Sequence, residues 1–155
     1  MRLIQQIEFF YQEEINHQLI LCSQGSLHGA QRSAADLLEI LCEANGRSVQ
    51  GSMDLFAKVN HAHQKLAVLV DPSSQEIYFP THSPENSQCI WVNYGKVKHV
   101  TKVHGNHCLI SFYSGTVFEV PCSVRVIRRQ LQRCQRLLDS LHNPYEQIND
   151  LFYQI

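Results

Sequence analysis

The residues best suited to chemistry gather in one segment, "DPSSQEIYFPTHSPENSQCIW", which spans positions 71–91 and ends on Cys89 and Trp91. A nucleophilic cysteine needs a thiol of lowered pKa and a histidine within reach. Cys89 falls in an expected strand instead of at a helix N-terminus, and His82 lies seven residues before it. The segment therefore favours a buried structural thiol over a catalytic one, with a recognition surface as the third interpretation.

Histidines and cysteines also raise the question of a metal. His61 and His63 could join His82, Cys42 and Cys89 in a zinc site. Tetrahedral zinc sites usually show at least one close C-x-x-C or H-x-x-x-H pair, and the spacing of "HAH" is a weak signal. Phosphate-binding loops and a G-x-S-x-G elbow are missing from the sequence. We therefore predict no metal, no cofactor and no enzyme, and a thiol or metal enzyme is supported by residue counts alone.

Charge is unevenly distributed along a chain whose formal net charge is −1. Residues 1–56 hold three basic side chains against seven acidic ones, whereas residues 57–142 hold ten against five. A basic segment between acidic ones is typical of a surface that faces a polyanion, although chance grouping produces the same pattern.

The bulk properties indicate one compact domain over residues 1–142 with a short tail over 143–155. A chain of 155 residues can bury a sizeable core. The sequence contains no apolar run near the roughly 18 to 20 residues of a membrane helix, and its start lacks the apolar stretch of a signal peptide. The six cysteines form no C-x-x-C pair. We expect reduced thiols, a cytoplasmic protein and no membrane partner.

Alternating and β-branched runs predict antiparallel strands joined by short turns. The first pair is a hairpin over 6–13 and 17–23, a polar loop follows over 23–33, and 34–46 is helical by propensity but short. Later strands are expected at 66–70, 76–79, 89–92, 96–103, 107–113 and 116–120. The pattern predicts an α+β fold, mainly an antiparallel β meander that could close like a barrel, with a C-terminal amphipathic helix packed on it.

After Pro121 the spacing of the hydrophobic residues changes to that of a helix, and Ser123 stands in the N-cap position. One apolar stripe comprises Val124, Ile127, Leu131, Cys134, Leu138 and Leu141. The opposite face carries Arg125, Arg128, Arg129, Gln132 and Arg136. This face is either solvated or built to contact the DNA backbone, because guanidinium groups pair with phosphate through two hydrogen bonds.

The segment at 71–91 resembles the signature of the competence transcription factor (ComK) family, with its D-P-S, F-P-T-x-S and Cys-x-Trp at this spacing. Upstream, "CEANGRSVQG" from Cys42 to Gly51 is similar to the family's Cys-x3-Gly-x4-Gly. Lys65, Gln130 and Arg133 also fall at the family's offsets, so the resemblance covers roughly residues 8 to 140.

The resemblance implies a cytoplasmic transcriptional activator of competence genes, which binds A/T-rich double-stranded DNA through the minor groove and self-associates on the DNA. Some members of the family are handed to a protease adaptor, which is a further possible partner. A-tracts narrow the minor groove and concentrate negative potential there, which favours inserted cations. We expect the DNA-binding residues to be Arg47, Lys58, Lys65, Lys96, Lys98, Arg125, Arg128, Arg129, Gln130, Arg133 and Arg136.

Two departures from the family pattern leave a second interpretation open. Ser52 and Met53 stand where the family usually places Arg-Lys, and the tail lacks the hydrophobic-Tyr-Pro-Lys element that some members present to a protease adaptor. The alternative is a diverged ComK-like paralogue that acts as a protein-interaction regulator with weak or no DNA binding.

Overall fold

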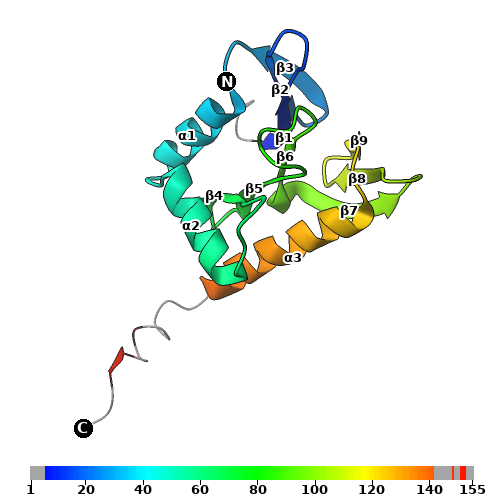
Figure 1. Ribbon diagram of the computed structural model, residues 1–155. Coiled ribbons are helices and arrows are strands. Elements are labelled where there is room, and N and C mark those ends of the chain that lie inside the picture. Colours follow the sequence, from blue (N-terminus) through cyan, green and yellow to red (C-terminus); the bar gives the residue numbers. More distant parts are fainter. Residues whose placement is uncertain (1–5, 142–147, 149–150, 153–155) are drawn as a thin grey trace.

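The computed structural model describes residues 6–141, 148, 151 and 152, and Figure 1 shows the chain. The predicted tail over 143–155 falls almost entirely outside these residues. No helix in the described part of the chain is both long and apolar enough to cross a bilayer.

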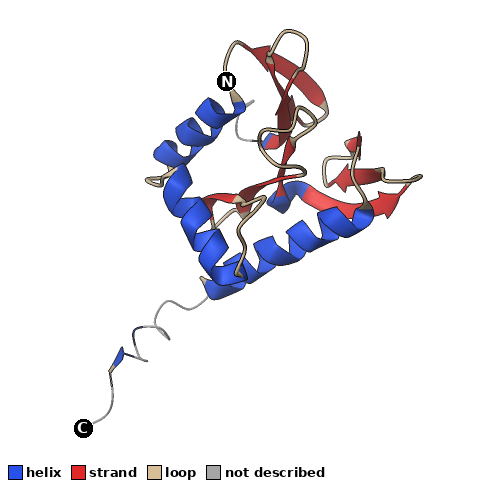
Figure 2. Cartoon of the chain, in the orientation of Figure 1, coloured by secondary structure: helices blue, strands red, loops and turns tan. Residues whose placement is uncertain are grey.

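The predicted antiparallel strands are confirmed, and over residues 6–141 they are divided between two sheets (Figure 2). The larger sheet has the order β3 (Ser26–Ala30), β2 (Leu19–Ser23), β1 (Ile7–Gln12), β6 (Ile90–Asn93), β5 (Glu76–Pro80) and β4 (Val68–Asp71). The smaller sheet has the order β7 (Val97–Lys102), β8 (Cys108–Phe112) and β9 (Val117–Val120).

The β meander does not close into a barrel, because it breaks between β6 and β7. The 3-10 turn Tyr94–Lys96 separates the two strands, and Asn93 caps this turn by accepting a hydrogen bond from the Gly95 N–H at 3.2 Å. A Cβ on Gly95 would lie 2.7 Å from the carbonyl oxygen of Gln75, so the turn packs closely against the β4–β5 connection. The chain therefore leaves the large sheet at β6 and starts the small one.

Between residues 6 and 141, three helices begin at serine N-caps: α1 (Ala34–Ala44), α2 (Val49–Asn60) and α3 (Val124–Ser140). The Ser123 hydroxyl accepts from the Val126 N–H, as the sequence predicted. The expected helix at 34–46 is confirmed, whereas α2 was not foreseen. The expected loop at 23–33 is wrong over Ser26–Ala30, because Gln24 and Gly25 both adopt positive φ angles (51° and 82°) and turn the chain back as a hairpin.

The large sheet is covered on both faces, which gives the protein two hydrophobic clusters. On one face, α1 contributes Leu38, Leu41 and Cys42 to a cluster around Trp91. On the other face, α3 and the small sheet pack together with Phe56 of α2. The start of α3 lies near β7 and its end near α2 (Figure 1). This long helix therefore contacts the small sheet at one end and α2 at the other.

A buried carboxylate also ties the two sheets together. Glu8 is 2% exposed, and the register of β1 against β2 shifts between Ile7 and Phe9. Its oxygens accept hydrogen bonds from the Gly25 N–H at 3.1 Å, from the Thr116 hydroxyl at 2.9 Å and from the Ser114 hydroxyl. The Glu8 carboxylate thus holds the turn between β8 and β9 against β1, and each of these three donors has a hydrogen-bond acceptor.

Candidate nucleic-acid interface

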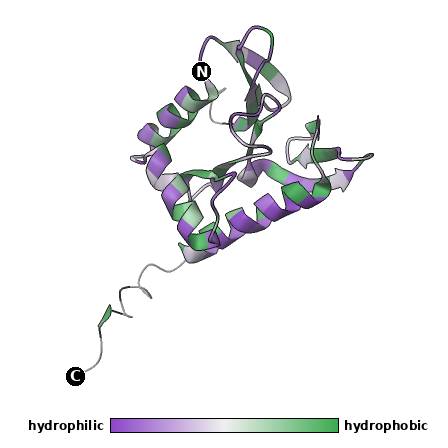
Figure 3. Cartoon of the chain, viewed as in Figure 1, coloured by the Kyte–Doolittle hydropathy of each residue, from purple (hydrophilic) through white to green (hydrophobic). Residues whose placement is uncertain are grey.

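The exposed side of α3 borders two adjoining hollows, which together we call the basic groove. The first hollow, of about 690 Å³, is lined by Lys102, Val124, Arg125, Arg128, Arg129 and Gln132. The second, of about 350 Å³, is lined by the loop 61–65 together with Arg129 and Arg133. Arg129 lines both hollows, so they lie next to each other on either side of its side chain. No described acidic side chain lines either one, and Figure 3 shows the hydrophilic side of α3.

The predicted polar face of α3 supplies the free cations of this groove. Arg125, Arg128 and Arg129 are exposed and form no salt bridge with any described residue. Their guanidinium groups therefore keep their donors available, and the planar fork of each suits a phosphate or carboxylate.

Gln130 and Arg133 differ from these arginines because both are buried, at 1% and 7% exposure. The Gln130 amide donates to the carbonyl oxygens of Lys65 at 3.0 Å and Pro80 at 2.9 Å. Arg133 donates to Gln130 Oε1 at 2.7 Å and to the carbonyl oxygen of Gln64 at 3.0 Å. These two residues therefore fasten the loop 61–65 to α3.

The Arg133 guanidinium also lies 4.9 Å from the centre of the Phe56 ring, a cation–π contact with the core residue of α2. Burial lowers the pKa of Arg133, and the neighbouring Arg129 lowers it further. The guanidinium of Arg133 is thus engaged by other residues of the protein. Its main contribution to the groove is to position the loop 61–65, which carries Lys65.

We expect Arg133→Ala to lower the free energy of unfolding by about 2 kcal/mol, because it leaves the buried Oε1 of Gln130 and the partly buried carbonyl oxygen of Gln64 without this donor and removes the stacking on Phe56. Chemical denaturation measures this change. Arg133→Lys is the matched control, since it keeps the charge but lacks the two-pronged donor, and it should recover part of the loss. An unchanged denaturation midpoint in Arg133→Ala would mean that water replaces these hydrogen bonds at no cost.

The remaining predicted residues do not line the basic groove. Arg136 donates to Asn60 Oδ1 at 3.5 Å, and Lys96 donates to Gln6 Oε1 at 3.0 Å. Arg47 lies near Asp71 instead. Hydrogen bonds from Ser73 lower the pKa of the Asp71 carboxyl, and the positive charge of Arg47 lowers this pKa further. Lys58 is exposed in the last turn of α2, and Lys98 is exposed on β7.

Three groove residues with ionisable side chains were absent from the predicted set: Lys102, His61 and His63. Lys102 ends β7, and its basic character was the available signal. His61 is the left-handed C-cap of α2, with φ 50°, and this geometry starts the loop that faces α3. No local sequence pattern reports that long-range approach.

Ser52, at the departure from the family pattern, is 4% exposed, and its hydroxyl donates to the carbonyl oxygen of Leu69 at 2.7 Å. Met53 packs against the α1-side cluster. Ser52 thus connects α2 to β4, and neither residue lines the basic groove.

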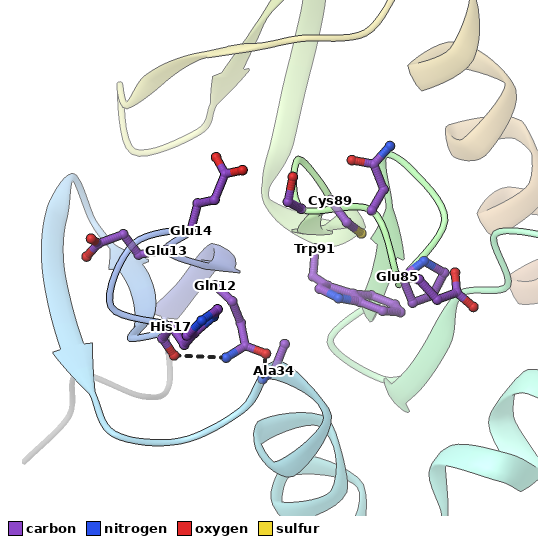
Figure 4. Close-up of a pocket in the computed structure, with 11 residues that line it drawn as sticks. Gln12, Glu13, Glu14, His17, Ala34, Glu85, Cys89 and Trp91 are labelled. Carbon is purple, nitrogen blue, oxygen red and sulfur yellow. Dashed lines mark hydrogen bonds between the residues drawn. The ribbon is translucent and has the colours of Figure 1, made fainter.

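The segment that ends on Cys89 and Trp91 borders a different hollow, of about 290 Å³, shown in Figure 4. Glu13, Glu14 and Glu85 line it, so its charge opposes the approach of an anion. It is therefore unsuited to the phosphate backbone that the basic groove could accept.

Cys89 does not form a catalytic pair with His82. The thiol donates to the carbonyl oxygen of His82 at 3.3 Å, and burial raises the pKa of Cys89. The His82 ring contacts the Thr81 hydroxyl through Nδ1 at 2.8 Å and the Pro121 carbonyl oxygen through Nε2 at 3.2 Å. Because that carbonyl can only accept, Nε2 carries the proton. A protonated thiol without an adjacent base is a poor nucleophile.

All six cysteines are free and buried, which leads to a prediction for alkylation. Burial raises the pKa of Cys22 to about 11 and that of Cys122 to about 12. We expect iodoacetamide at neutral pH to label the native protein far more slowly than the denatured protein, in which all six thiols react. Mass spectrometry counts the adducts. Rapid single labelling of Cys89 in the native state would reopen the case for a reactive thiol.

The fold and its surface define an α+β protein in which one long helix carries a basic groove without described acidic lining. The family model described as "ComK protein" matches residues 8–145, and the chain belongs to this family. It is also similar to the competence transcription factor of Bacillus subtilis (strain 168), with 29% identity over 92 residues. That match covers 59% of this chain and 48% of the relative, about half the relative's length. No solved structure gives a significant match.

Proposed function

We propose that this protein regulates transcription of competence genes by binding A/T-rich double-stranded DNA, and that the basic groove is the surface that contacts the DNA. The observation that carries the proposal is the pair of neighbouring hollows along α3 that share Arg129 and have basic but no described acidic lining residues. Family membership and the name of the Bacillus subtilis relative support the choice of DNA as the polyanion. Cytoplasmic location follows from the same function.

The chemistry of the groove suits a phosphate backbone beside a narrow minor groove. The exposed arginines of α3 can pair with phosphate oxygens, which fixes register without reading sequence. Preference for A/T would come from a guanidinium inserted where an A-tract narrows the minor groove. Paired A/T boxes would be occupied by more than one protomer, so self-association on DNA belongs to this proposal. Recognition by a protease adaptor would be a separate property of the chain.

We expect the protein to bind a duplex with paired A-runs and T-runs more tightly than a G·C-rich duplex of equal length. Its affinity should fall steeply with salt, because each neutralised phosphate releases counterions. Fluorescence anisotropy with both labelled duplexes, at low and near-physiological salt, measures this. Steep salt dependence without A/T preference would retain backbone binding and contradict minor-groove selectivity.

A second candidate function is protein-interaction regulation, favoured by the acidic hollow at Trp91. Three carboxylates on its rim suit a cationic segment of a partner protein. Equal and feeble binding to both duplexes would favour this function over DNA binding. A shift of the protein in size-exclusion chromatography with a DNA-binding relative would then detect the mixed assembly.

A further inference from the structure

The turn between β7 and β8 brings two imidazoles beside a carboxylate of β9. His107 Nδ1 lies 3.2 Å from Glu119 Oε2. The rings of His104 and His107 stack with their centroids 5.0 Å apart and an interplanar angle of 25°. One ligand atom from each of the three residues lies within 4.8 Å of the other two. Two histidines and a glutamate thus converge outside the basic groove.

The backbone fixes this convergence. The His107 N–H donates to the carbonyl oxygen of His104 at 2.9 Å, and the Val103 N–H donates to that of His107 at 3.3 Å. Gly105 takes a positive φ of 50° inside the turn, where a side chain would be strained. On the neighbouring strands Leu109 pairs with Glu119, which places His107 diagonally across from the carboxylate. Both histidines are therefore directed to the same end of the small sheet as Glu119.

We propose that His104, His107 and Glu119 bind a divalent transition-metal cation of the zinc class. Imidazole nitrogen and carboxylate oxygen are common zinc ligands, at about 2.0 to 2.2 Å. Two such ligands on a tetrahedral ion lie about 3.3 to 3.5 Å apart, which follows from those bond lengths. The observed 3.2 Å between His107 and Glu119 is close to this separation. His104 then has to move its imidazole modestly to complete three protein ligands.

The three residues are accessible to an ion from solvent. The side chains of His107 and Glu119 are 39% and 46% exposed, and His104 is exposed as well. A fourth coordination position would face water. The softer thiolate ligands do not compete in the folded protein, because every cysteine is buried. The site goes beyond the zinc set considered from sequence, which missed this one because Glu119 comes from a different strand.

Zinc binding to the full-length chain without an affinity tag tests the proposal. Competition with a chromophoric zinc chelator should give one ion per chain, and Co²⁺ in place of Zn²⁺ should give the visible absorption bands of a low-symmetry site. We expect His104→Ala with His107→Ala to weaken zinc binding at least tenfold, roughly the size of effect that loss of even a supporting group has on a metal site. Glu119→Gln should also weaken zinc binding, because it removes the carboxylate charge while keeping the size of the side chain.

The matched control is His61→Ala with His63→Ala, which removes two other exposed histidines and should leave zinc affinity unchanged. Circular dichroism verifies that each variant is folded, and Zn²⁺ should raise Tm of the parent and of the control but not that of His104→Ala with His107→Ala. The proposal is overturned if the parent binds no zinc, if the His104/His107 variant binds as tightly as the parent, or if the control loses as much affinity.

Discussion

Replacing Arg128 and Arg129 together by alanine should weaken DNA binding on the order of a hundredfold. Both guanidinium groups line the basic groove and have no acidic partner among the described residues. A hydrogen bond to a charged group contributes about 1.5 kcal/mol, so two phosphate contacts give roughly this factor. The loss should be similar on A/T-rich and G·C-rich duplexes to the extent that both residues contact phosphate, because phosphate contacts carry no direct sequence information.

Salt dependence separates phosphate contact from general charge. Loss of two contacts should reduce the slope of log affinity against log salt by about two. Arg32→Glu is the control, since it changes the net charge by the same two units at an exposed site outside the groove. It should alter the slope little. If Arg32→Glu and the double variant lose equal affinity, the groove is not the DNA-binding surface. Thermal melts should show both variants as stable as the parent.

The sequence predicted the outward face of α3 well and its inward face less well. Arg125, Arg128 and Arg129 follow directly from helical periodicity, and they are exposed as expected. Gln130 and Arg133 are polar, so a hydrophobic pattern assigns them to solvent, yet both are buried. Their burial depends on the carbonyl oxygens of Gln64, Lys65 and Pro80, which are distant in sequence. Periodicity describes one helix and cannot report acceptors on other elements.

Among the strands, too, the pairings between neighbours in sequence were predictable and those between distant segments were not. The hairpins β1–β2 and β4–β5 were predicted because short turns join alternating runs. The pairing of β6 with β1 links residues some eighty positions apart, and no local signal contains it. The same holds for the basic groove, because the loop that carries Lys65 is held against α3 by hydrogen bonds from Gln130 and Arg133, which are distant in sequence.

Trp91→Ala should lower the free energy of unfolding by about 3 to 5 kcal/mol, because it removes a large side chain from a packed cluster. Trp91 is 5% exposed on β6, between β1 and β5. Its ring stacks on Phe10 with centroids 6.4 Å apart and planes 15° apart. The α1 residues Leu38 and Leu41 belong to the same cluster. The cavity left behind would loosen the contact between α1 and the large sheet.

Urea denaturation followed by far-ultraviolet circular dichroism measures this loss, since the variant has no tryptophan to report by fluorescence. Trp91→Phe is the matched control, and it should lose less stability because it keeps an aromatic ring in the cluster. DNA affinity of the folded fraction should remain near that of the parent, because Trp91 does not line the basic groove. If Trp91→Ala unfolds like the parent but no longer binds DNA, the recognition surface includes the acidic hollow that Trp91 lines, and the basic groove is not sufficient for binding.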